Sequence, residues 1–96
     1  MNVEPTTTHK ENLAALNRIV GQVNGIKKMI EDEKYCIDII NQMLAVIHAL
    51  YRITEKILAK HIEKCVKDAF ISRSKKKIDK KISEIMGVIK RLRKLS

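Results

Sequence analysis

The chain has 96 residues, a length that supports at most one small domain. Lys and Arg number 20 against 11 Asp and Glu, so the formal net charge is +9, and only 3% of the residues are aromatic. With 45% hydrophobic and 32% charged residues, no Trp and a single Pro, the composition argues against a β-sandwich or an α/β enzyme and favours an all-α oligomer. The charge favours a polyanionic partner, nucleic acid before an anionic membrane.

The sequence also bears on the cellular compartment. No apolar run approaches the roughly 18 residues that a membrane span needs, and the Thr-rich N-terminus lacks the apolar core of a signal peptide. We therefore expect a cytoplasmic protein with no membrane partner. In a reducing compartment, its two cysteines are more often thiols that bind metal or react than a structural disulfide.

The N-terminal third predicts a short arm followed by a helix. Residues 1–7 are polar and lack periodicity, so we expect a flexible arm, and residues 8–96 read as a single helical domain. Thr8 and Glu11 match a capping box, which predicts a first helix from Thr8 to about Glu31. Gly21 and Gly25 lie inside it, and each costs about 1 kcal/mol relative to Ala, so we expect a close backbone approach to another helix there.

The stretch from Tyr35 to Cys65 contains neither Gly nor Pro and predicts one long central helix. Its apolar residues form two rows. The first row, called the seam below, recurs at steps of three and four residues, as in a coiled coil. The second row widens the apolar face, so that it can meet both the first helix and a partner chain. The seam comprises Cys36, Ile40, Met43, Ile47, Leu50, Ile57, His61 and Cys65, and the second row comprises Ile39, Val46, Ile53 and Ile62 with Leu44 and Leu58.

A basic segment separates the central helix from a third one. Arg73, Ser74 and the three lysines at 75–77 suggest a solvated loop. After it, apolar residues from Ile78 to Leu92 keep helical spacing and predict a short amphipathic helix.

Two cysteines and a histidine share one stripe of the predicted central helix. At about 100° per residue, Cys36, His61 and Cys65 lie within roughly 20° of a common line. At about 1.5 Å per residue, however, Cys36 and His61 are roughly 37 Å apart, so one chain cannot close both around one atom. If two copies pair antiparallel, the Cys36 end of one helix meets the His61 and Cys65 end of the other, and a two-fold dimer gains two equivalent sites.

The donor set indicates which ion such a site would take. His61 and Cys65 form an i, i+4 pair that points two donors at one position, although a core Cys beside a rim His would give the same spacing. Two thiolates and one imidazole suit Cu(I) in trigonal geometry best, because structural Zn(II) normally wants a fourth ligand. Only Glu4 or His9 near the N-terminus could supply one. A thiol enzyme would need an oxyanion loop and a third orienting residue, which the sequence lacks, so we expect no enzymatic activity.

Four segments together resemble the CsoR-type family of bacterial copper-sensing transcriptional repressors. The resemblance covers roughly residues 12–92. The segments are Asn17-Arg18-Ile19-Val20-Gly21-Gln22-Val23-Asn24-Gly25-Ile26, Tyr35-Cys36-Ile37-Asp38-Ile39, His61-x3-Cys65-Val66-x-Asp68-Ala69 and Ile82-Ser83-Glu84-Ile85.

The resemblance implies a fold and a function. Members are all-α dimers of dimers that bind operator DNA without a helix-turn-helix and release it when metal binds. It therefore implies a three-helix protomer, an antiparallel dimer that forms a four-helix bundle, and one Cu(I) per protomer bound between subunits. Cys36, His61 and Cys65 fall at the ligand positions. Tyr35 and Glu84 fall where members place the residues around the ligands, and a carboxylate there could accept from the second imidazole nitrogen.

Several alternatives stay open. Nickel sensors of this family use an N-terminal His and a second His where this chain has Cys65, while its persulfide and aldehyde sensors each lack one of the three ligands. Outside the family, a basic helical architectural DNA-binding protein would have the same charge but no dependence on its thiols. A titration with a high-affinity Cu(I) chelator separates these hypotheses.

Residues for DNA binding follow from the resemblance and from charge. Arg18 and Gln22 match the DNA-facing surface of the family, although Ala15 stands where members often carry another Arg. Arg52 is a further candidate phosphate contact. In the C-terminal segment we assign Lys80, Lys81, Lys90 and Arg91 to phosphate contact, because basic residues without interleaved aromatics position a protein on duplex DNA rather than stack on bases.

Overall fold

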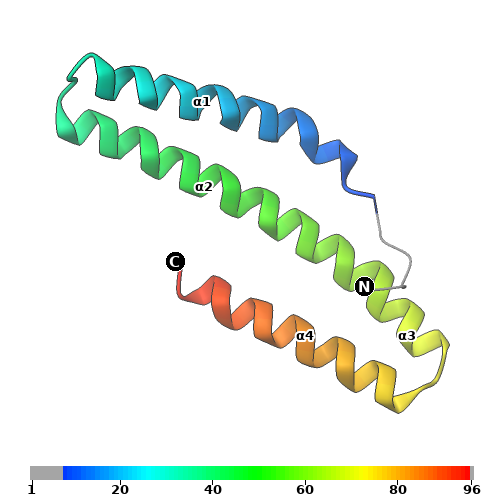
Figure 1. The fold of residues 1–96 in the computed structure, drawn as a ribbon. Coiled ribbons are helices and arrows are strands. Elements are labelled where there is room, and N and C mark those ends of the chain that lie inside the picture. Colours follow the sequence, from blue (N-terminus) through cyan, green and yellow to red (C-terminus); the bar gives the residue numbers. More distant parts are fainter. Residues whose placement is uncertain (1–7, 96) are drawn as a thin grey trace. The chain divides into compact units, whose positions relative to one another are not determined.

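The computed structural model describes residues 8–95, which contain helices and no strand (Figure 1). The all-α prediction is confirmed, and so is a three-helix protomer with one long central helix. Residues 8–57 and 58–95 form two compact units, and the predicted arm, 1–7, lies outside the described residues. In chain order the elements are the 3₁₀ turn η1 (Lys10–Asn12), α1 (Leu13–Glu31), α2 (Cys36–His61), the π-helical turn η2 (Ile62–Val66), α3 (Lys67–Ile71) and α4 (Lys75–Arg93).

Helix α1 starts later than the capping box predicted. Regular α-helix begins at Leu13, because η1 precedes it and the amide of Asn12 donates to the carbonyl of His9 at 3.0 Å. The amide of Lys10 donates to the Thr8 hydroxyl at 3.5 Å, so Thr8 supports this 3₁₀ turn. The predicted start was therefore early by several residues.

The end of α1 at Glu31 matches the prediction and has a defined cap. The amide of Lys34 donates to the carbonyl of Met29 (2.9 Å), and that of Glu33 donates to Ile30 (3.1 Å). This pair of bonds is a Schellman motif, in which the residue after the cap adopts a left-handed conformation. Here that residue is Glu33, with φ of 54°, where Gly would carry no steric cost.

The core of the N-terminal unit lies between α1 and α2, which run antiparallel (Figure 1). Ile19 and Ile26 on α1 and Val46 and Ile53 on α2 are each 9% exposed or less. Both pairs are seven residues apart, the repeat at which packed helices return to one face. The second apolar row of the central helix is therefore the one that meets α1.

The central helix is longer than predicted and contains an irregularity. Helical structure runs without interruption from Cys36 to Ile71, but α-helical bonding gives way to a π-helical turn at Ile62–Val66. By length and composition this run could cross a membrane, in contrast to the sequence-based expectation, although the core helix of a soluble protein passes the same test. No Gly or Pro marks the π turn, so the sequence gives no local signal for it.

Helix α4 begins three residues before the position predicted. Lys75, Lys76 and Lys77 form its first turn, not a loop, because Ser74 caps the helix by accepting from the amide of Lys77 at 3.3 Å. In the C-terminal unit α4 packs against η2 and α3. The buried residues of this unit are Ala69, Lys81 and Ile85.

The two glycines of α1 make no close approach within the protomer. A Cβ at Gly21 or Gly25 would meet no other atom within 4 Å. The close helix contact expected at this pair is therefore absent from the described residues of one chain.

Candidate metal centre and DNA-facing surface

The first predicted ligand, Cys36, is an exposed free thiol at the first residue of α2. The carbonyl of Tyr35 accepts from the amides of Asp38 (3.0 Å) and Ile39 (3.2 Å), so its backbone closes the first turn. Tyr35 itself is 68% exposed. Both residues are thus accessible at this end of α2 in the isolated protomer.

The other two predicted ligands occur where α2 changes its hydrogen-bonding pattern. His61 is the last residue of α2, and Cys65 lies inside η2 and forms no disulfide; both are partly buried. Bonds in a π turn run from residue i to i+5 and widen the helix. The two residues keep their separation of four, but the angle calculated for a continuous α-helix does not apply to Cys65.

The ligands from one chain do not converge. Cys36 and His61 are the first and last residues of the 26-residue helix α2, which separates them by roughly 37 Å at 1.5 Å per residue. Within residues 8–95, no three side chains of His, Cys, Asp or Glu are grouped so that they could hold a metal ion. A complete site needs donors from outside the described part of this protomer.

The seam of α2 is uncovered in the protomer. Ile40 is 48% exposed, Met43 49% and Ile47 52%, whereas Val46 and Ile53 of the second row are buried against α1. Among the described residues, seventeen large hydrophobic side chains are exposed and six hydrophobic residues are buried. Contiguous exposed apolar surface of this kind is a common feature of interaction sites.

Glu84 lies on α4 at the edge of the face that packs on η2 and α3, next to the buried Ile85. Its Oε1 is 3.8 Å from the Nζ of Lys81, and the two side chains are 50% and 10% exposed. Lys81 was predicted to contact phosphate, but its side chain is buried in the described protomer. Its spacing from Ile78 and Ile85, three and four residues, would have placed it on the apolar face.

Only one of the two residues considered as a fourth metal ligand belongs to the described part of the chain. Glu4 lies outside the described residues. His9 is partly buried, and its Nδ1 is buried without a hydrogen-bond partner among the described residues. Among the side-chain nitrogens and oxygens of the described residues, this is the one buried atom without a hydrogen-bond partner.

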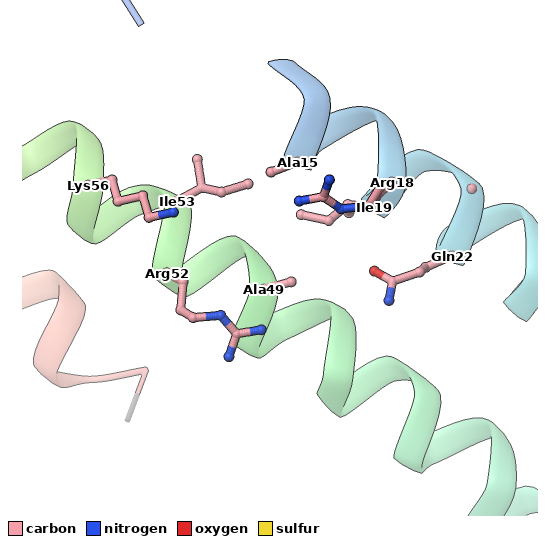
Figure 2. A pocket seen from close by; sticks show the side chains of 9 residues that line it. Ala15, Arg18, Ile19, Gln22, Ala49, Arg52, Ile53 and Lys56 are labelled. Atoms are coloured by element: carbon pink, nitrogen blue, oxygen red, sulfur yellow. The ribbon is translucent and has the colours of Figure 1, made fainter. Parts of the chain in front are cut away.

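Three of the residues predicted to face DNA line one cavity of about 580 Å³ between α1 and α2. Figure 2 shows Arg18 and Gln22 on α1 across this hollow from Arg52 on α2. Small residues, Ala15 and Ala49, keep the hollow open, and no acidic side chain lines it. Cations from two helices therefore lie around one hollow, and such a cluster can bind a phosphate group.

Lys56 was not predicted and lines the same cavity (Figure 2). It comes four residues after Arg52, so the helical period of α2 places the two on one face. That spacing was visible in the sequence and would have found this residue.

The remaining basic residues predicted for DNA are exposed on α4. Lys80 and Arg91 line one shallow hollow, together with Glu84, and Lys90 lines another with Arg93 and Lys94. Three of the four predicted cations of this segment therefore reach solvent, and Lys81 does not.

Comparison with known sequences gives consistent matches. The family model of the metal-sensitive transcriptional repressors matches residues 8–91. The chain is 40% identical over 87 residues to the copper-sensing transcriptional repressor RicR of Mycobacterium tuberculosis, covering 90% of each chain. It is 39% identical over 79 residues to the copper-sensing transcriptional repressor CsoR of Bacillus subtilis, covering 82% of this chain and 75% of the relative.

Solved structures agree with these matches. The copper-sensing repressor CsoR with Cu(I) from Geobacillus thermodenitrificans superposes with a TM-score of 0.79 at 35% identity, over 92% of both chains. The nickel-responsive regulator InrS gives a TM-score of 0.72 at 25% identity, over 95% of this chain and 99% of that one. These relatives are regulators, as expected, and not enzymes. The chain belongs to the metal-sensitive transcriptional repressor family and is a repressor of the CsoR type.

Proposed function

We propose that this chain is a cytoplasmic Cu(I)-responsive repressor, which holds its operator DNA without metal and releases it when Cu(I) binds. The observation that carries the proposal is the placement of two cysteines without a disulfide and an imidazole at the two ends of a helix whose apolar seam is uncovered. Similarity to a CsoR structure solved with Cu(I) supports the choice of metal.

The donor chemistry of the proposed site fits Cu(I). Cys36 from one protomer and His61 and Cys65 from its partner would provide two soft thiolates and one imidazole, with one ion per protomer. Bound Cu(I) would tie the ends of two facing helices together. Tyr35 borders Cys36 in the chain, and Glu84 would accept from the imidazole nitrogen of His61 that does not bind metal. The packing of α4 on η2, which directly follows His61, supports this role of Glu84.

A second copy of the chain is the partner that the uncovered seam requires. Antiparallel pairing of two α2 helices would bury Ile40, Met43 and Ile47 of each chain and bring Cys36 of one to the His61 end of the other. The resulting dimer would be a four-helix bundle, and two dimers would form the tetramer expected for this family.

The DNA interface would comprise two basic regions. Arg18, Gln22, Arg52 and Lys56 share one cavity on the N-terminal unit, and Lys80, Lys90 and Arg91 are exposed on α4. Neither region contains an aromatic residue. Both are therefore suited to phosphate contact on duplex DNA, with specificity from Arg18 or from groove shape.

One observation favours a nickel sensor as the second candidate. The buried Nδ1 of His9 has no hydrogen-bond partner among the described residues. An ion that takes more ligands than Cu(I) would need a further donor besides the thiolates, and a nitrogen near the N-terminus could provide it. Similarity to the nickel-responsive regulator InrS is in keeping with this reading. Replacement of His9 by Ala separates the two, because it would weaken Ni(II) binding and leave Cu(I) binding intact.

A competition titration tests the proposal directly. Full-length protein is titrated with Cu(I) against a high-affinity chelator while fluorescence anisotropy follows binding of operator DNA. We expect one tightly bound Cu(I) per chain, a thiolate-to-copper charge-transfer band, and loss of DNA affinity at the same stoichiometry. DNA affinity that does not change on Cu(I) loading contradicts the proposal. Release by Ni(II) alone identifies the second candidate.

A further inference from the structure

The hollow between α1 and α2 has two kinds of lining. Its floor is apolar, since Ile19 and Ile53 line it and each is only 6% exposed. Its rim carries the exposed cations Arg18, Arg52 and Lys56 (Figure 2). The cavity volume of about 580 Å³ lies within the roughly 300–1,000 Å³ of small-molecule pockets in proteins. A ligand that fits this lining combines negative charge with an apolar body.

Positive charge is concentrated around the hollow. Of the described residues that line it, none is Asp or Glu. Arg52 and Lys56 are four residues apart on α2, and two like charges at this spacing destabilise a helix. Arg18 adds a third positive charge from α1. An anion in the hollow would relieve this repulsion, so the site favours a multiply charged group such as a phosphate.

Gly21 and Gln22 add shape and hydrogen bonding to the lining. A Cβ at Gly21 would contact nothing within 4 Å beyond its own stretch of helix, so packing inside the protomer does not account for a residue that weakens α1. The glycine leaves the wall of the hollow without a side chain, and a ligand can therefore approach the backbone. The amide of Gln22 can both donate and accept, as the edge of a nucleobase requires.

The hollow lies on the side of α2 that the seam does not occupy. At about 100° per residue, Ala49 lies roughly 200° around the helix from Ile47, and Arg52 lies the same angle from Leu50. Ile47 and Leu50 belong to the seam through which two copies would pair. Pairing through the seam would therefore leave the hollow open, and a small molecule could reach it in the dimer.

We propose that this hollow binds a free nucleoside phosphate. The phosphate would lie between Arg18 and the two cations of α2, and the ring system would pack on the apolar floor with its edge towards Gln22. Arg18, Gln22 and Arg52 are also the residues assigned to DNA, so the two ligands would compete; this consequence rests on the proposed function. A nucleoside phosphate would then weaken operator binding in metal-free protein, and the repressor would have an input independent of copper.

The first test titrates ADP into metal-free, full-length protein without DNA, by isothermal titration calorimetry. Gly21→Leu places a side chain in the hollow. Gly25→Leu is the matched control, because Gly25 is equally unobstructed and does not line the hollow. We expect ADP to bind once per chain, Gly21→Leu to weaken it about tenfold or more, and Gly25→Leu to change it by less than about twofold. Absence of ADP binding, or an equal loss in both variants, overturns the proposal.

A second pair of variants tests the charges and does not depend on the fit of a new side chain. Arg18→Gln removes a cation of the hollow. Lys27→Gln makes the same change nine residues further along α1, which is roughly 180° around the helix. Arg18→Gln should weaken ADP binding about tenfold, and Lys27→Gln should weaken it far less. Equal losses would show that ADP responds to net charge and not to the hollow, and would refute the proposal.

Two further probes separate the parts of the ligand. Inorganic pyrophosphate carries the charge without the ring system, and adenosine carries the ring system without the charge. Each should bind about tenfold or more weakly than ADP, because each loses one of the two kinds of contact. Pyrophosphate that binds as tightly as ADP would show that the apolar floor is not used, and would contradict the assignment to a nucleoside phosphate.

Competition with DNA is measured by fluorescence anisotropy on metal-free protein at constant ionic strength. ADP at about ten times its own Kd should raise the apparent Kd for operator DNA about tenfold, since both ligands need the same cations. If ADP binds in the hollow and Gly21→Leu removes it, but DNA affinity does not change, the nucleotide site stands. The proposed DNA interface at this hollow then fails instead.

Discussion

The two units of the chain bury different kinds of residues. In residues 8–57, aliphatic side chains at seven-residue intervals, Ile19, Ile26, Val46 and Ile53, form a continuous core. In residues 58–95, the buried positions are Ala69, Ile85 and a lysine, and the unit contains a π-helical turn. A core of interlocked aliphatic residues resists deformation, whereas a small core with a charge and an irregular turn opens at lower cost. Under the proposed function, we expect the N-terminal unit to act as the rigid part and the C-terminal unit as the part that responds to metal.

The largest expected effect tests whether both units contribute to one metal site. Cys36 belongs to the N-terminal unit and Cys65 to the C-terminal unit, so replacing either by Ala should abolish tight Cu(I) binding in a chelator competition. Mixing the two variants should regenerate about one site per heterodimer, since one chain retains Cys36 and the other retains His61 and Cys65. Mixed dimers that bind no copper would show that the site is not shared between subunits.

Stability should separate the buried row from the uncovered seam. Ile53→Ala removes a core side chain that is 6% exposed, and should lower the free energy of unfolding by about 2–5 kcal/mol at every protein concentration. Ile47→Ala is the matched seam variant, at a residue 52% exposed in the protomer. It should act by weakening the dimer, which sedimentation velocity and the concentration dependence of the thermal midpoint detect. A midpoint for Ile47→Ala that does not depend on concentration would remove the seam from the interface.

The DNA-binding contributions of the two units can be compared by salt titration. Neutralising Arg18, Arg52 and Lys56 together, or Lys80, Lys90 and Arg91 together, removes three cations from one unit at a time. Each triple variant should lower the slope of log affinity against log salt by two to three, at about 0.9 per lost phosphate contact. A slope that stays unchanged removes that unit from the DNA interface. Lys81→Met serves as the control, because it removes a buried cation that does not reach solvent.

The smallest expected effect concerns two residues other than glycine that have a positive φ, one in each unit. Glu33 has φ of 54° and Arg73 has φ of 57°, and both follow the end of a helix. Replacing either by Gly relieves the steric cost of the left-handed region but adds entropy to the unfolded chain, for a net gain of about 0.5 kcal/mol. Urea denaturation of the two variants measures the gain. A loss of stability in one of them would show that its side chain makes contacts that outweigh the strain.

Most of the fold could be predicted from the periodicity of the apolar residues, because their spacing identifies an amphipathic helix. The end of α1 at Glu31, the unbroken central helix and the split of its apolar residues into two rows were all visible in the sequence. The start of α4 was missed because three consecutive lysines resemble a solvated loop. Ser74, a good N-cap residue directly before them, was the stronger signal.

The parts of the site that could not be predicted depend on packing. The π turn at Ile62–Val66 has no local signature, since it contains neither Gly nor Pro, and it occurs where the chain contacts α4 and α3. Lys81 was assigned to DNA from its charge, whereas its position between Ile78 and Ile85 decides its burial. The assignment of Lys81 to DNA stays a prediction, whereas helical periodicity would have indicated its burial.

The three lysines that open α4 have an electrostatic consequence of their own. The first turn of a helix exposes amide groups that carry partial positive charge, and α4 begins with Lys75, Lys76 and Lys77 and no acidic residue. Like charges at this end fray the turn, so the bond from the amide of Lys77 to Ser74 should open more often in dilute buffer than in concentrated salt. Amide exchange at Lys77 should slow as ionic strength rises, and slow further when a polyanion lies along the helix. The start of α4 would then be firmest when the protein is on DNA.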